Sequence, residues 1–133
     1  MTPFGVKLRA IRAERGMTLK EMAESLGVSP AYLSALEHGR RGRPAHPMVV
    51  AICAQLNIIW DDADELLHLA RLSHPRVTVD TAGLRSEATE LANLLAERIR
   101  KLTQGEIAAM LAILKNAPGA KPPRRRGAAK ARR

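Results

Sequence analysis

The stretch that decides the fold is GMTLKEMAESLGVSPAYLSALEHG, residues 16–39. It holds two short segments typical of helices, and each has its own start signal. Thr18 and Glu21 have the spacing of a capping box, which predicts that LKEMAESL is a helix. Ser29 followed by Pro30 supplies an N-cap and a proline at the first helical position, which predicts a second helix.

Small and apolar residues then predict how these two helices pack. Gly27 ends the first helix at a turn with positive φ, a conformation that glycine adopts without steric cost. Ala23 is small enough to let the helices cross closely, and Val28, Leu33 and Leu36 are expected to fill the space between them. A helix, a glycine turn and a second helix form the pattern of helix-turn-helix DNA-binding proteins.

Helical spacing also marks the segments on either side. Apolar residues at this spacing predict a first helix before Gly16. Pro47 predicts the start of a fourth helix, and the acidic residues from Asp61 onward favour the start of a fifth that ends near Ser73. We therefore expect an all-α fold that opens with a five-helix domain over residues 1–75.

Residues 76–116 are expected to form a linker and C-terminal helices. RVTVD alternates like a strand, but a lone strand has nothing to pair with, so we predict an extended linker. A long amphipathic helix should start at Ser86, and a second capping box, Thr103 with Glu106, should start another. Residues 117–133 contain only Pro, Gly, Ala, Lys and Arg, and we expect a disordered basic tail.

The C-terminal helices carry an apolar stripe that is too large for a solvated helix. Either it folds back on the first domain or it pairs with another subunit, and we favour a dimer. The stripe consists of Ala88, Leu91, Leu95, Ile99, Leu102, Ile107, Met110, Leu111 and Leu114.

The net charge of +9 is unevenly distributed. Residues 1–45 carry +4, residues 46–116 carry −2 and residues 117–133 carry +7. This asymmetry indicates a polyanionic partner for the N-terminal part and the tail. A membrane surface also attracts basic residues, so charge alone does not decide between the two.

Cysteine and hydropathy narrow the class of protein further. Cys53 is the one cysteine, so an intrachain disulfide and a cysteine-based metal cluster are excluded. We expect Cys53 itself to be a small residue of the core. No apolar run approaches the ~18 residues needed to cross a bilayer. The start of the sequence lacks the apolar stretch of a signal peptide, which predicts a cytoplasmic protein with no membrane partner.

Residues 16–39 closely resemble the helix-turn-helix of the phage-repressor (Cro/cI, or XRE) family. The resemblance covers roughly residues 4–72 and includes the order of five helices. It implies that the helix after the turn lies in the major groove and that the protein acts as a dimer on a near-palindromic operator. It also implies an ion pair between Arg12 of the first helix and Glu37 at the end of the recognition helix.

The resemblance places the residues of the motif that would contact DNA. Base-reading positions fall on small side chains, and none of them can make the bidentate contacts that discriminate bases by ~1–3 kcal/mol. Leu19 also stands where many family members have a glutamine that contacts phosphate. We therefore expect this helix to make few contacts that discriminate between bases. The candidate DNA-contacting residues of the motif are Lys20, Ser29, Pro30, Ala31, Tyr32, Ser34 and Ala35.

Three arginines follow the recognition helix and add to the candidate site: Arg40, Arg41 and Arg43. We favour contact with phosphates over insertion into the minor groove, and simple solvation is the third interpretation. Insertion into the minor groove is considered because Arg-Gly-Arg-Pro, residues 41–44, resembles the core of the AT-hook. The AT-hook places arginines in narrow A·T-rich minor grooves.

The other polar residues that could suggest a metal site or a catalytic site are better explained as ordinary surface residues of a helix. Asp64 and His68 lie one helical turn apart, a spacing that suits metal ligands, but no third ligand is evident. We expect Trp60 to be a core residue or a dimer contact. The sequence contains no nucleophile with a paired base, no phosphate-binding glycine loop and no zinc motif, so we expect neither an enzyme nor a cofactor.

These features predict a sequence-preferring transcription regulator that binds double-stranded DNA, a repressor acting as a homodimer. The alternative is an antitoxin-like interaction protein whose C-terminal helices neutralise a protein partner while the N-terminal domain autoregulates. A third interpretation is a non-specific DNA-coating protein driven by the basic tail.

Overall fold

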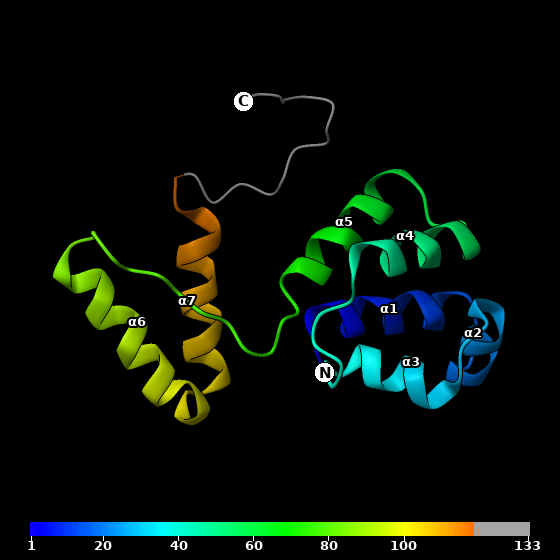
Figure 1. Ribbon diagram of the computed structural model, residues 1–133, viewed down its shortest axis with the longest axis horizontal. Coiled ribbons are helices and arrows are strands. Elements are labelled where there is room, and N and C mark those ends of the chain that lie inside the picture. Colours follow the sequence, from blue (N-terminus) through cyan, green and yellow to red (C-terminus); the bar gives the residue numbers. More distant parts are fainter. Residues whose placement is uncertain (119–133) are drawn as a thin grey trace. The chain divides into compact units, whose positions relative to one another are not determined.

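The computed structural model describes residues 1–118, which divide into a first unit, Met1–Val77, and a second unit that begins at Thr78. All regular structure in this range is helical (Figure 1). The first unit contains α1 (Pro3–Glu14), α2 (Leu19–Leu26), α3 (Pro30–Glu37), α4 (His46–Gln55) and α5 (Trp60–Arg71). The second unit contains α6 (Ser86–Arg98), a single 3-10 turn (Ile99–Lys101) and α7 (Gln104–Asn116).

The predicted all-α class and the five helices of the first unit are confirmed. RVTVD forms no strand, as predicted. The disorder predicted for residues 117–133 falls, from residue 119 onward, outside the described residues. No helix within residues 1–118 is long and apolar enough to span a membrane.

One apolar core holds the first unit together. α1 lies between α3 on one side and α5 on the other, α2 packs against α3 and α4, and α4 packs against α5 (Figure 1). The buried apolar side chains come from all five helices and from the α4–α5 connection: Phe4, Leu8, Ile11, Met22, Ala23, Leu33, Leu36, Val49, Ile52, Cys53, Leu56, Ile58, Leu66 and Ala70.

The start signals of α2 and α3 work as the sequence predicts. The Glu21 N–H donates to Thr18 Oγ1 at 3.0 Å, and the Thr18 N–H donates to Glu21 Oε1 at 2.8 Å, which completes the capping box. Gly27 adopts φ 73°, and the next N–H, that of Val28, donates to the Ala23 carbonyl. Ala23 is fully buried, so the small residue does allow α2 and α3 to cross closely.

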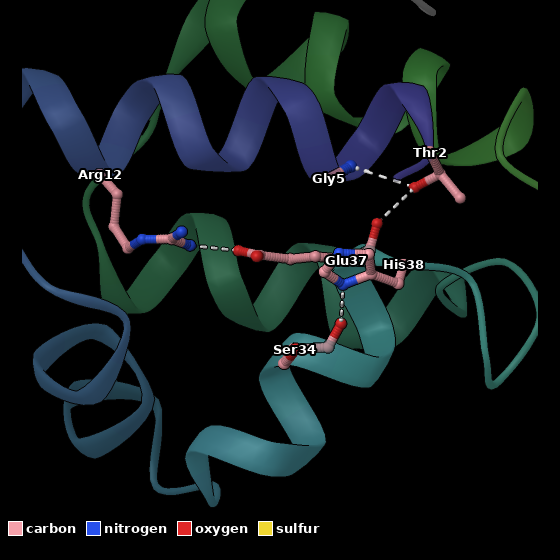
Figure 2. Close-up of polar contacts among 6 residues, drawn as sticks. All are labelled: Thr2, Gly5, Arg12, Ser34, Glu37 and His38. Carbon is pink, nitrogen blue, oxygen red and sulfur yellow. Dashed lines mark hydrogen bonds and ion pairs between the residues drawn. The ribbon is translucent and has the colours of Figure 1, made fainter.

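Glu37, the last residue of α3, is the point at which α1 and α3 are joined (Figure 2). Its carboxylate is paired with the Arg12 guanidinium near the end of α1, and both side chains are buried. Its carbonyl oxygen accepts from the N–H and from Oγ1 of Thr2, at 3.1 and 3.0 Å. The ion pair implied by the family resemblance is therefore present, and one residue of α3 is bonded near both ends of α1.

Close contact between backbones makes this junction possible. A Cβ on Gly5 would lie 2.1 Å from the Glu37 carbonyl oxygen, so only glycine fits at this position. The α1 N-terminus is also closed by side chains, because Thr2 Oγ1 accepts from the Gly5 N–H and Ser73 Oγ accepts from the Phe4 N–H. Ser73 lies just after α5, so this bond fixes the end of α5 against the start of α1.

The expectation that Trp60 is a core residue is wrong, because its side chain is 79% exposed. The connection between α4 and α5 is short, and it inserts Ile58 into the core instead. Asn57 and Trp60 both adopt positive φ, and the adjacent Ile59 is exposed like Trp60. The alternative role of Trp60 as a dimer contact stays a prediction.

The second unit has helices but no buried residues in α6 or α7. The predicted capping box is present: the Glu106 N–H donates to Thr103 Oγ1, and the Thr103 N–H donates to Glu106 Oε1. The apolar stripe is therefore exposed along both helices, with Leu91 66% exposed and Leu111 46% exposed.

We predict that Glu37→Ala lowers the free energy of unfolding by ~3–5 kcal/mol, because it leaves the Arg12 guanidinium buried without its partner. Urea unfolding followed by circular dichroism measures the change. The matched control replaces both partners, Arg12→Met with Glu37→Leu, and should recover most of the loss. A Glu37→Ala midpoint equal to that of the wild type would show that the pair does not hold α1 to α3.

We also predict that Gly5→Ala destabilises the first unit by ~1–3 kcal/mol or more, because backbone atoms of Glu37 cannot move away from the new methyl group. The control is Gly105→Ala in α7, where a Cβ meets nothing within 4 Å. This change should be neutral or slightly stabilising. Equal thermal midpoints for the two variants would contradict the close approach of α1 and α3.

Candidate nucleic-acid interface

The outward face of α3 carries only short side chains. Leu33, Leu36 and Glu37 point into the unit, whereas Pro30 and Ala31 are exposed. Ser34 and Ala35 are half-buried. With 3.6 residues per turn, Ala31, Ala35 and His38 form one outward line along the helix and its end.

The chemistry of this face follows from these side chains. Methyl groups of Ala31 and Ala35 suit apolar contact with thymine methyls, and the Ser34 hydroxyl can form one hydrogen bond. The face has no bidentate donor. Side chains this short would not keep the α3 backbone away from a groove.

Two candidate residues of the motif lie at helix starts. Ser29 Oγ accepts from the Tyr32 N–H at 3.0 Å, so this hydroxyl is used as the N-cap of α3. Lys20 is exposed in the first turn of α2, where its ammonium can reach a phosphate. Leu19 is partly buried against the core, so the position where many family members have glutamine faces inward here.

The three arginines after α3 project from a turn that is closed by backbone hydrogen bonds. Gly39 and Gly42 adopt φ 76° and 75°, which bracket Arg40 and Arg41 between two left-handed residues. The Arg40 N–H donates to the Ala35 carbonyl at 3.0 Å, which closes the end of α3 in a Schellman motif. Pro44 is buried and anchors the far side of the turn.

The arginines are exposed, but one of them has a specific neighbour. Arg41 Cζ lies 4.9 Å from the centroid of the Tyr32 ring, within the range of a cation–π contact. Both residues are among the candidate DNA contacts in the sequence, where nothing connects them. No periodicity relates a residue near the start of α3 to one in the turn after it, so the sequence offers no signal for the contact.

The described residues that could act as metal ligands or nucleophiles do not form a metal site or a catalytic site. Among residues 1–118, no group of three or more His, Cys, Asp or Glu side chains could hold a metal ion. Cys53 is buried in the core, as predicted, and burial raises the pKa of its thiol. The thiolate that would act as a nucleophile or metal ligand is therefore disfavoured.

Comparisons with known proteins agree with this geometry. A protein-family model described as a helix-turn-helix domain matches residues 3–73. The HTH-type transcriptional repressor RghR of Bacillus subtilis (strain 168) is 38% identical over 100 residues, which cover 71% of this chain and 73% of RghR. No solved structure matches the chain significantly.

Shorter matches occur with other bacterial regulators. The uncharacterized HTH-type transcriptional regulator RghRB of Bacillus subtilis (strain 168) is 34% identical over 62 residues, 47% of this chain and 45% of that protein. The transcriptional regulator ClgR of Mycobacterium tuberculosis (strain ATCC 25618 / H37Rv) is 41% identical over 54 residues, 41% of this chain and 47% of ClgR. The matches span about half the length of these two relatives.

The family match covers more than half of the chain, and the RghR match extends beyond the five-helix unit into the C-terminal helices. The chain thus belongs to the helix-turn-helix family of DNA-binding transcription regulators, which are not enzymes.

Proposed function

We propose that this protein is a transcriptional repressor that binds a near-palindromic operator as a homodimer, with α3 in the major groove. The observation that carries the proposal is the geometry of α2, the turn at Gly27 and α3, which leaves Pro30 and Ala31 exposed on the same unit as the basic turn at residues 40–43. Repression would result from occupancy, since a bound dimer blocks access of polymerase to the promoter. RghR, which matches 71% of this chain, is named a repressor.

The candidate residues divide into two groups by their chemistry. Pro30, Ala31, Ser34 and Ala35 would lie against base edges, where small side chains permit close approach. Residues with longer or polar side chains would hold the phosphate backbone and set the register of α3. This second group contains Lys20, Ser29, Tyr32, Arg40, Arg41 and Arg43.

The proposed function also gives each part of the chain a role. Residues 1–75 form the DNA-binding domain, and residues 76–116 form the linker and the dimerisation region. Residues 117–133 carry seven basic and no acidic residues. They would strengthen binding to any nucleic acid by releasing counterions.

Dimerisation is supported by the exposed stripe of the second unit. A near-palindromic operator repeats its half-site about every 10 base pairs, which requires two copies of α3. The apolar side chains on α6 and α7 are exposed, and burying them in an interface would remove them from water. A protein partner on the same stripe is the alternative, and the oligomeric state of the purified chain discriminates between them.

The function is tested by selecting bound sequences from a library of random duplexes. We expect a near-palindromic consensus for the wild type. We predict that Ala31→Glu weakens binding to that consensus about tenfold or more, because it places a negative charge beside the phosphates. Folding should be unaffected, since an acidic residue is favourable in the first turn of a helix.

The matched control for this variant is Ala51→Glu, which adds the same charge at an exposed position of α4. It should bind the selected duplex within about twofold of the wild type, because an exposed charge distant from DNA is screened by salt. Equal losses for the two variants, or a selection that yields no consensus, would contradict major-groove binding through α3.

We predict that Leu111→Glu converts the dimer to a monomer, because it places a charge in the centre of the apolar stripe. Sedimentation equilibrium of the full chain measures the mass. The control is Ala109→Glu, which adds the same charge on the opposite face of α7 and should leave the dimer intact. If Leu111→Glu and the wild type have the same mass, the interface lies elsewhere or the stripe serves another partner.

A further inference from the structure

The Tyr32 ring is a fixed support on the surface of the DNA-binding unit. Its side chain is partly buried and packs against the apolar core, so the ring cannot move freely. The Tyr32 N–H is also bonded to Ser29 Oγ, which holds the backbone of this turn. The guanidinium of the exposed Arg41 lies over this ring, with its Cζ 4.9 Å from the centroid.

The position of Tyr32 around α3 decides what this guanidinium can reach. Tyr32 lies roughly a quarter of a turn from the outward line through Ala31 and Ala35. When the outward line faces the base edges of a groove, the flanks of the helix face the groove walls. These walls are the phosphate backbones, so Arg41 is held on a phosphate-facing side of α3.

Stacking also leaves the right part of the guanidinium available. The guanidinium lies over the ring, and its N–H donors that do not face the ring stay available. In-plane donors match the oxygens of a phosphate, which a guanidinium binds in a bidentate manner. The backbone supports the same geometry, because the Arg40 N–H donates to the Ala35 carbonyl and the Gly42 N–H donates to the Gly39 carbonyl, which holds the turn from which Arg41 projects.

We propose that Tyr32 and Arg41 act as one phosphate-binding unit, in which the Tyr32 ring positions the Arg41 guanidinium against a backbone phosphate at the edge of the major groove. This inference rests on the proposed function. It assigns Tyr32 a positioning role through its ring face. It also gives the two arginines of the Arg-Gly-Arg-Pro segment different roles. Arg41 lies over a residue of α3 and so does not extend into a minor groove, whereas Arg43 has no such contact within residues 1–118.

The test measures the affinity of the full chain for a short fluorescent duplex of mixed sequence over a series of salt concentrations. Arg41→Ala should lower the slope of log K against log salt by about 1, because one phosphate contact is lost. Tyr32→Leu, which removes the aromatic face, should weaken binding about two- to fivefold, the effect of one exposed cation–π contact. Tyr32→Phe, which keeps the ring and removes only the hydroxyl, should bind more tightly than Tyr32→Leu.

Coupling between the two residues is the decisive readout. In the Arg41→Ala background, Tyr32→Leu should have no further effect, whereas in an Arg43→Ala background it should keep its full effect. Arg41→Ala should weaken binding equally on A·T-only and G·C-only duplexes, as expected for phosphate contact. Melting curves monitor folding. If Tyr32→Leu unfolds, Tyr32→Met, a longer apolar side chain that also lacks the ring, takes its place in the same comparison.

Three results would overturn the inference: additive effects of Tyr32→Leu and Arg41→Ala, a Tyr32→Phe variant as weak as Arg41→Ala, or an Arg41→Ala loss confined to the A·T-only duplex. Each requires that the wild type binds DNA. A wild type that binds no duplex would contradict the proposed function itself, so the two failures are distinguishable.

Discussion

The buried pair of Arg12 and Glu37 is the interaction on which the rest of the structure depends. α3 has eight residues, and an isolated helix of this length is unstable in water. Its last residue is therefore held from two sides: the carboxylate by Arg12 and the carbonyl by Thr2. Because Gly5 lets the α1 backbone touch Glu37, the same junction also sets the distance between α1 and α3.

This arrangement determines which face of α3 the proposed DNA contacts can use. The inner face of α3 is occupied by core packing and by the junction with α1, so the outer face alone is available for DNA. That face is short and carries small side chains, which favours close approach but supplies little charge. The basic turn after α3 supplies the charge, and the Schellman motif at Gly39 connects it rigidly to the helix.

Local signals made much of the fold predictable from the sequence. Capping boxes at Thr18 and Thr103 and the glycine at position 27 act through neighbouring backbone atoms, so spacing alone reveals them. The Arg12–Glu37 pair connects distant residues, and only the family resemblance predicted it. Contacts that depend on how helices cross were not predictable, which includes the approach of Gly5 to Glu37.

The same limit applies to the candidate site. The structure places the candidate residues on α2, on α3 and its N-cap, and in the basic turn, where they are exposed or half-buried. The contact between Arg41 and Tyr32 depends on the path of the turn in space, which the sequence does not reveal. The error at Trp60 has a similar origin, since hydropathy does not reveal that the α4–α5 connection places Ile58 inside and Trp60 outside.

The most direct test of the account is the change in backbone amide chemical shifts of the labelled protein when a DNA duplex is added. If α3 and the basic turn contact DNA as proposed, the largest changes fall on the start of α2, on residues 29–35 and on the turn at residues 40–43, while amides of α5 change little. Changes centred on α5 or on α6 and α7, with α3 unaffected, would contradict it.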